Sequence, residues 1–219
     1  MRIPLKSLLF LFIAFMAMAQ GASATVVTYT FGDEFSGSGS TLSGNVVVTI
    51  DDGGGTGSVD ITVNTNDLDG SLFEFITGLY LNLDPALDPA AIVASDDGTD
   101  PDATYNFGTD AFMADGDGLY DILIEWPTAG ADRFLADMTD MFTFTLLGLT
   151  ASSFQFESTP AGGHGPFEAV LRAQGLDANA EGSGFFSPDG DEDVPEPATF
   201  TLVGLGVFCL GLALRHRRS

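Results

Sequence analysis

Apolar and polar residues alternate along several short stretches of this chain. Residues 27–31, 58–63 and 142–146 alternate strictly, and a period of two is the pattern of a β-strand with one buried face. Each of these stretches is therefore predicted to be a strand. Less regular apolar stretches predict further strands at residues 46–50, 73–83, 120–126, 153–157 and 167–173.

Turn-forming residues separate the predicted strands. Residues 51–55, 66–70 and 162–166 are rich in Asp, Asn, Gly and Pro, which favour tight turns. Residues 131–138 alone have the composition of a short helix. Short alternating strands with glycine-rich turns predict an all-β fold, an antiparallel β-sandwich of jelly-roll-like type, with a closed barrel as the alternative.

The first residues of the chain form a different kind of segment. Arg2 and Lys6 are followed by an apolar run and then by Ala22 and Ala24, which flank Ser23 in an A-x-A pattern. These features predict a secretory signal peptide over residues 1–24, handled by the Sec translocon and cut by signal peptidase after Ala24. An uncleaved anchor is the weaker alternative, because the apolar run is short for a bilayer.

The last residues form a second apolar segment. Residues 198–214 carry no charge, and a helix of this length is about 26 Å long, just enough to span a membrane. Arg215, Arg217 and Arg218 lie in the basic segment 215–219, which is expected to stay on the cytoplasmic side. The sequence thus predicts a single transmembrane helix with the bulk of the chain exported. An ordinary single-pass anchor has the same features.

The residues before the apolar span carry a more specific signal. Pro195, Glu196 and Pro197 precede the span and the arginine-rich end, and in this order the tail resembles the PEP-CTERM sorting signal. The resemblance implies that the partner exosortase, a membrane-embedded protease-transpeptidase, cuts near the tripeptide. It also implies a bacterium with a Gram-negative-type envelope, a transient inner-membrane anchor, and delivery to the cell surface or extracellular matrix. Residues 154–184 more faintly resemble the closing part of short secreted β-rich PEP-CTERM proteins.

These segments divide the chain into four parts. The signal peptide is followed by a β-sandwich domain over residues 25–176, an acidic flexible linker over 177–194, and the sorting signal over 195–219. The only cysteine, Cys209, lies in the apolar tail. The exported part can therefore form no disulfide and must be stabilised by its packed core.

Charge narrows the possible partners of the exported part. The chain has 31 Asp and Glu residues, and all of them except Glu196 lie in residues 25–194, together with only Arg133 and Arg172 as basic side chains. A surface of this sign repels phosphates, so nucleic-acid binding is excluded. Many of the acids are Asp, a common turn former, and this is the simpler explanation for their number.

One acidic stretch has the spacing of a calcium loop. Asp115, Asp117 and Asp121 alternate with glycines or lie close to them, so a tight loop could bring several hard oxygen ligands around one cation. The stretch lacks the remaining ligands of an EF-hand. Weak Ca²⁺ binding is predicted here, against the alternative of a solvated turn.

Two classes of function remain compatible with the sequence. No nucleophile motif accompanies the lone exported histidine, His164, and no carboxylate pair can be selected, so no catalytic residues are assigned. Trp126 more often caps a core than binds a sugar. We therefore expect a non-enzymatic surface or matrix protein associated with exopolysaccharide. The alternative is a module that binds or hydrolyses carbohydrate.

Overall fold

The computed structural model describes residues 24–70, 73–96, 102–115, 118–161, 164–176 and 181–188. These residues form strands and two short 3₁₀ turns, η1 (Pro89–Ala91) and η2 (Ala151–Phe154). The strands are β1 (Val26–Gly37), β2 (Val46–Asp51), β3 (Ser58–Asn64), β4 (Phe75–Leu81), β5 (Val93–Asp96), β6 (Thr104–Met113), β7 (Gly118–Glu125), β8 (Thr139–Thr145), β9 (Thr159–Pro160), β10 (Ala169–Gln174) and β11 (Ser183–Pro188).

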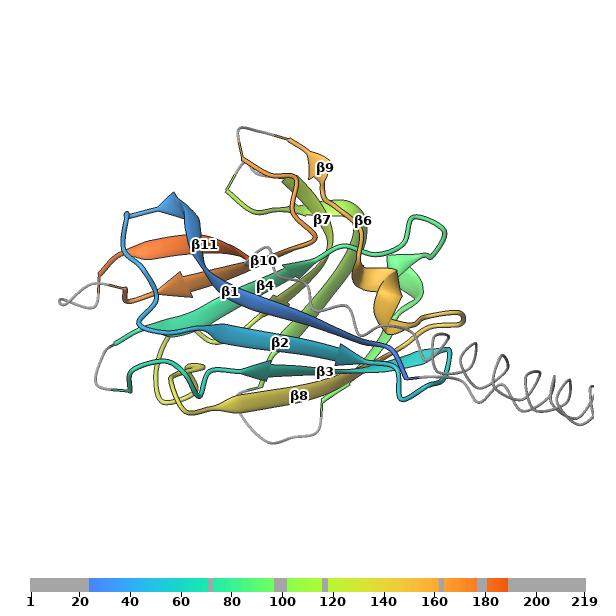
Figure 1. Ribbon diagram of the computed structural model, residues 1–219, viewed down its shortest axis with the longest axis horizontal. Helices are drawn as coiled ribbons and strands as arrows, with labels where there is room; N and C mark the ends of the chain where they lie inside the picture. The colour runs from blue at the N-terminus through green and yellow to red at the C-terminus, as the bar shows by residue number, and fades with distance from the viewer. Residues whose placement is uncertain are drawn as a thin grey trace, which may run out of the picture.

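The strands form one continuous antiparallel sheet (Figure 1). Its order is β5-β8-β3-β2-β1-β11-β10-β4-β7-β6, and β9 pairs with β7. The all-β antiparallel prediction is confirmed. The expected division into two sheets is replaced by a single sheet, because β11 bonds to both β1 and β10 and so joins what would have been separate halves.

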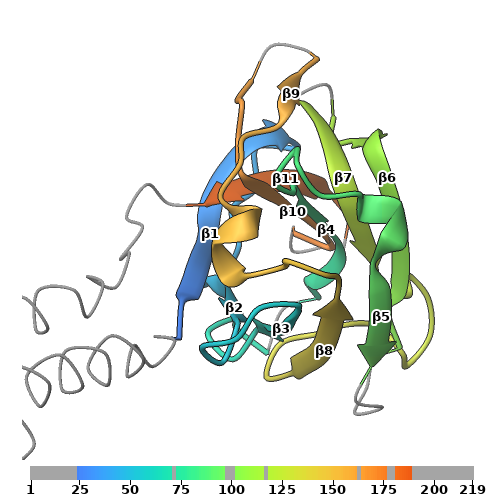
Figure 2. The same ribbon diagram turned by 90° about the vertical axis from the view of Figure 1, so that its right-hand side faces the viewer.

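The sheet is rolled so that its two edge strands lie close to each other (Figure 2). Tyr105 of β6 contacts the rings of Phe142 and Phe144 in β8, with centroid distances of 5.2 and 5.9 Å. Its hydroxyl donates a hydrogen bond of 2.7 Å to Asp96 of β5. Among the described strands, no backbone ladder joins the edge strands β5 and β6. Side-chain contacts of Tyr105 connect these two edges instead.

The enclosed face forms the main core. In β3 and β8 every second residue is buried, which confirms the period-two prediction. Phenylalanine and aliphatic side chains fill the interior, among them Phe31, Phe144, Phe154 and Phe186, all with no exposed surface. Trp126 belongs to this core: it is 3% exposed and its indole nitrogen donates to Asp140 at 2.6 Å. Core packing is therefore the role of this tryptophan.

Strand β4 is buried on both faces. On its other face a smaller cluster forms around Tyr80, Tyr120 and Val170, against which Phe35 and Phe185 pack. Burial raises the pKa of Tyr80, and the nearby Arg172 partly opposes this shift. The centre of the sheet is thus covered on both sides.

Two of the predicted elements do not form. Residues 131–138 form turns instead of a helix, and Phe134 makes a bridge to Ile76 that places its ring in the core. Residues 153–157 do not form a strand, since η2 ends at Phe154. In both segments burial of one phenylalanine decided the local conformation against the intrinsic preference of its neighbours.

The folded domain is longer than the sequence predicts. Strand β11 lies inside the segment 177–194, for which the sequence predicts a flexible linker. Phe186 is fully buried, and a Cβ added at Gly184 would lie 2.6 Å from the Glu34 carboxylate and 3.1 Å from the Phe186 ring. The domain therefore extends to Pro188, and the small glycine-rich residues that resembled a linker allow close strand packing instead.

Both predicted export signals lie largely beyond the described ranges. Of residues 1–24 only Ala24 is described, and the tripeptide at 195–197, the apolar span 198–214 and the basic end 215–219 all fall outside. Within the described residues no helix has the length and apolar character needed to cross a membrane.

Candidate functional site

The predicted calcium residues lie near the start of β7. Asp115 follows β6 with a φ of 44° and accepts a hydrogen bond from the Ser36 hydroxyl. Asp117 is outside the described residues. Asp121 lies within β7. Among the described side chains, no three acidic, histidine or cysteine groups come together as a metal site. The calcium prediction therefore continues to rest on the sequence spacing alone.

Asp121 makes two hydrogen bonds to backbone groups of other chain segments, which the sequence does not predict. One carboxylate oxygen accepts the backbone N–H of Asp110 at 2.8 Å, and the other accepts that of Leu83 at 3.1 Å. Asp121 thus ties strand β6 and the chain segment after β4 to β7. Each oxygen has further acceptor capacity, since an ionised carboxylate offers about four lone-pair positions.

The segment of β6 that Asp121 binds is irregular. Pairing between β6 and β7 shifts register between Phe107 and Phe112, and Asp110 has a φ of 49°. Aspartate tolerates this left-handed conformation better than most residues. A bulge re-aims side chains at a sheet edge, and here it brings Thr109 and Asp110 to the rim of a cavity.

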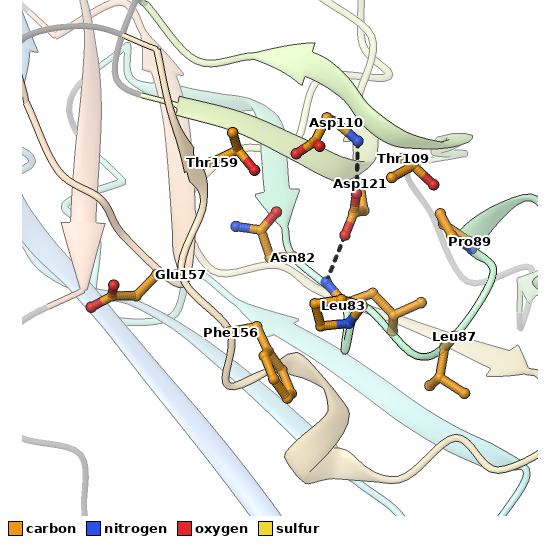
Figure 3. Close-up of a pocket in the computed structure, with 11 residues that line it drawn as sticks. Asn82, Leu83, Leu87, Pro89, Thr109, Asp110, Asp121, Phe156, Glu157 and Thr159 are labelled. Carbon is orange, nitrogen blue, oxygen red and sulfur yellow. Dashed lines mark hydrogen bonds between the residues drawn. The ribbon is translucent and has the colours of Figure 1, made fainter.

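The cavity has a volume of about 230 Å³ and lies between three chain segments (Figure 3). One wall is the loop after β4, from Asn82 to Pro89, and another is the β6 bulge with Asp121. The third wall comprises residues 156–159, with the half-buried Phe156 ring at its base. The cavity therefore has one polar side and one apolar side.

Asn82 is the most unusual residue of this lining. Its side chain is 4% exposed, and its amide nitrogen has no hydrogen-bond partner. Its backbone is fixed, because the Asn82 N–H donates to the carbonyl of Glu168 at 3.3 Å. A buried donor without an acceptor costs about 1–3 kcal/mol. In Figure 3 its amide lies beside the space bounded by Asp121 and Thr159.

The charged groups among the described lining residues are all acidic. They are Asp110, Asp121 and Glu157, and the described lining contains no Lys, Arg or His. With a net charge of −24 on the chain, the site disfavours anions. Hydroxyl groups, which both donate to carboxylates and accept from amides, match this set of side chains.

His164 lies elsewhere, exposed and near the small aromatic cluster on the other face of β4. Its ring is 5.6 Å from that of Phe35. None of the described residues that line the cavity is a histidine or cysteine, so this lining has no side chain of the kind that activates a serine nucleophile.

Comparison with known proteins adds a finding at the end of the chain. Residues 193–218 match the PEP-CTERM protein-sorting motif. The chain thus carries this sorting signal, which supports an exported protein processed by exosortase. No curated protein and no solved structure matches the chain significantly. The motif contains the predicted residues Pro195, Glu196 and Pro197 and the predicted basic residues Arg215, Arg217 and Arg218.

Proposed function

We propose that this chain is a non-enzymatic surface or extracellular-matrix protein, exported through the inner membrane of a Gram-negative-type bacterium and associated with exopolysaccharide. Exosortase processing is the part that the sorting motif at residues 193–218 supports. The matrix role and the absence of catalysis are our inference from the acidic domain and from a cavity lined by hydrogen-bonding groups.

The observation that carries this proposal is the placement of the motif relative to the fold. The last described strand, β11, ends at Pro188, and the motif begins at residue 193. β11 pairs with β1 and β10 in the middle of the sheet. A cut near Pro195 therefore removes the tail and leaves every described strand in the mature protein.

The acidic surface fits a role outside the cell. Repulsion among like charges keeps such a protein soluble and limits its self-association. The same charge repels acidic polymers unless a divalent cation lies between them. Neutral polysaccharides are therefore accepted more readily by this surface than acidic ones.

The second candidate is a carbohydrate-active module. The mixed polar and apolar cavity beside Asn82 is the observation that favours it. Hydrolysis would need two carboxyl groups on opposite sides of a glycosidic bond, about 5–10 Å apart, one of them acting as an acid. Binding without hydrolysis needs only the hydrogen bonds and the apolar wall, so we favour binding.

The processing step can be tested on protein recovered from the cell surface or the medium. We expect mass spectrometry to find peptides up to the region of Pro195 and none beyond it. The double substitution Pro195→Ala with Glu196→Ala is expected to retain the full-length chain in the membrane fraction. Arg217→Lys, which keeps the charge of the basic end, is the matched control and should be processed normally. If protein recovered from the cell surface or the medium still carries the complete tail, the tail is an ordinary single-pass anchor and the processing proposal is wrong.

A further inference from the structure

The cavity beside Asn82 has hydrogen-bonding requirements that its own residues leave unmet. The Asn82 amide nitrogen has no acceptor although the side chain is 96% buried, the complement of its 4% exposure. Buried amides in folded proteins are nearly always paired. Asn82 lines the cavity while its amide nitrogen itself is buried, so an acceptor that enters the cavity can pair with the nitrogen only after the amide rotates, and the terminal torsion of an amide is soft.

On the side of the cavity formed by Asp121, a ligand must supply hydrogen-bond donors. Both oxygens of Asp121 already accept one backbone N–H each, which leaves acceptor positions directed away from those bonds. The Thr159 hydroxyl and the Asp110 carboxylate lie at the same opening (Figure 3). A complementary ligand must therefore present oxygen atoms that accept from Asn82 and O–H groups that donate to carboxylates.

The apolar wall adds a requirement of shape. Phe156 and Leu87 are half-buried and lie on the side opposite the β6 bulge. An aromatic face packs well against the C–H face of a flat ring. A cavity of about 230 Å³ is smaller than the roughly 300–1,000 Å³ of sites for drug-sized ligands. The volume is thus suited to one ring and not to a long segment of polymer.

We propose that this cavity binds a single neutral sugar ring, with Asn82 donating to a ring or hydroxyl oxygen, Asp121 and Asp110 accepting from hydroxyls, and Phe156 packing against the C–H face. The ring would be a terminal or branch residue of a neutral polysaccharide. This inference deepens the proposed association with exopolysaccharide and rests on it only for the choice of polymer.

Other occupants fit the lining less well. A uronic acid or another anion meets Asp110, Asp121 and Glu157 without a compensating cation among the described lining residues. A bare divalent cation leaves the Asn82 N–H unpaired, because a metal ion offers no acceptor. Water alone can fill the space, but it makes no use of the half-buried Phe156 wall.

The test uses the processed protein recovered from cells that export it. Methyl α- and β-glycosides of glucose, galactose, mannose and N-acetylglucosamine are titrated by ligand-observed NMR and calorimetry, with methyl glucuronide and calcium chloride as separate arms. We expect saturable binding of at least one neutral glycoside, with a Kd of roughly 1 mM, as is reasonable for a few hydrogen bonds to a single ring. Glucuronide and calcium ions are expected to show no competition with it.

The decisive variant is Asn82→Leu, which removes the amide and keeps the branching and the number of heavy atoms of the side chain. Binding should weaken by about tenfold or more, whereas the melting temperature should stay the same or rise, because the unpaired donor is gone. Asn106→Leu is the matched control: the Asn106 amide is 3.1 Å from the Glu125 carboxylate outside the cavity, so this change should lower the melting temperature slightly and leave binding intact.

A second pair of variants keeps the test decisive if Asn82→Leu does not fold. Phe156→Ala removes the apolar wall and Thr159→Val removes a rim hydroxyl; each should weaken binding in a folded protein. The proposal is overturned by the absence of saturable binding to every neutral glycoside, by binding that these variants leave unchanged, or by preferential binding of glucuronide or calcium at this site. Intact sorting tails in the same sample would count against exosortase processing and would leave the binding result as it stands.

Discussion

Asp52 shows how a single carboxylate positions the start of the folded domain. It accepts the backbone N–H of Thr25 at 2.8 Å, that of Gly54 at 2.9 Å and that of Ala151 at 3.4 Å. Burial acts to raise the pKa of Asp52, but these backbone hydrogen bonds together outweigh it and hold the pKa below its usual range. The residue therefore stays ionised in conditions where most carboxyl groups begin to take up protons.

This contact predicts that signal-peptide removal stabilises the domain. If cleavage follows Ala24, the Thr25 nitrogen becomes an ammonium group beside the Asp52 carboxylate. We expect a chain starting at Thr25 to melt up to about 3 °C higher than one that retains Ala24, since partly exposed ion pairs contribute less than about 1 kcal/mol. Thermal melts of the two chains at pH 6 measure the difference.

The pH dependence of this gain has a defined sign. The folded pKa of Asp52 is lowered, so its contribution is present above the unfolded value near 4 and is lost as the pH falls through the lower, folded pKa. Asp52→Asn should abolish the difference between the two chains at pH 6, whereas the exposed Asp102→Asn should preserve it. If the two chains still differ in melting temperature when both carry Asp52→Asn, the stabilisation comes from a group other than Asp52.

At the scale of elements, turns depend on glycine for two separable reasons. Gly39 and Gly175 have nearly the same left-handed conformation, with φ of 76° and 74°. A Cβ at position 39 would meet nothing within 4 Å, whereas one at position 175 would lie 2.4 Å from the carbonyl oxygen of Phe73. A side chain at either position is therefore destabilised by the left-handed conformation. Only at position 175 does it also clash with neighbouring backbone.

Alanine at the two positions should separate these costs. Gly39→Ala is expected to lower stability by about 1 kcal/mol, the penalty for a left-handed L-residue. Gly175→Ala should lower it by about 1–3 kcal/mol more, because the backbone around Phe73 must shift. Urea unfolding of both variants gives the comparison. Equal losses would show that the Gly175 turn relaxes without resistance.

Elements also differ in how clearly the sequence marks them. Strands β3 and β8 alternate cleanly, and the sequence predicts their ends within a few residues of those observed. Strand β6 has no such alternation, because its bulge at Asp110 interrupts the period. Strand β11 lies among glycine, serine and acidic residues, where Phe185 and Phe186 are the apolar exception, and its long-range pairing shows that it is part of the sheet.

At the scale of the whole molecule, β11 is the strand on which the sheet depends. It lies between β1 and β10, and the register of both pairings includes Phe186. A chain ending at Pro188 is expected to melt cooperatively at nearly the same temperature as a chain ending at residue 194. A chain ending at Gly182 should show no cooperative transition, because it exposes two strand edges and leaves the space of a buried phenylalanine empty.

Circular dichroism and thermal melts of the three chains provide the measurement. The chain that ends at residue 194 is the control for any effect of the acidic residues after Pro188. Cooperative folding of the chain ending at Gly182 would mean that β11 is an accessory strand. In that case exosortase could cut before Pro188 without unfolding the domain, which is further upstream than we propose.

The amino-acid sequence by itself determined the local properties of this protein. Strand periodicity, turn positions, the sign of the surface charge and the sorting motif are encoded in neighbouring residues, and short-range physics suffices to recognise them. The matched motif at residues 193–218 confirms the predicted sorting signal. The calcium assignment of Asp115, Asp117 and Asp121 is likewise local, and it stays a prediction.

Only the tertiary structure decided how distant segments meet. Asn82, Asp110 and Thr159 come from three separate parts of the chain, and no spacing in the sequence relates them. The sheet is rolled so that Tyr105 contacts Asp96. Phe134 is buried although its segment has the composition of a helix. Both results depend on the packing of the whole fold. Burial of large apolar side chains outweighs local preference, and which residues it brings together depends on the whole fold.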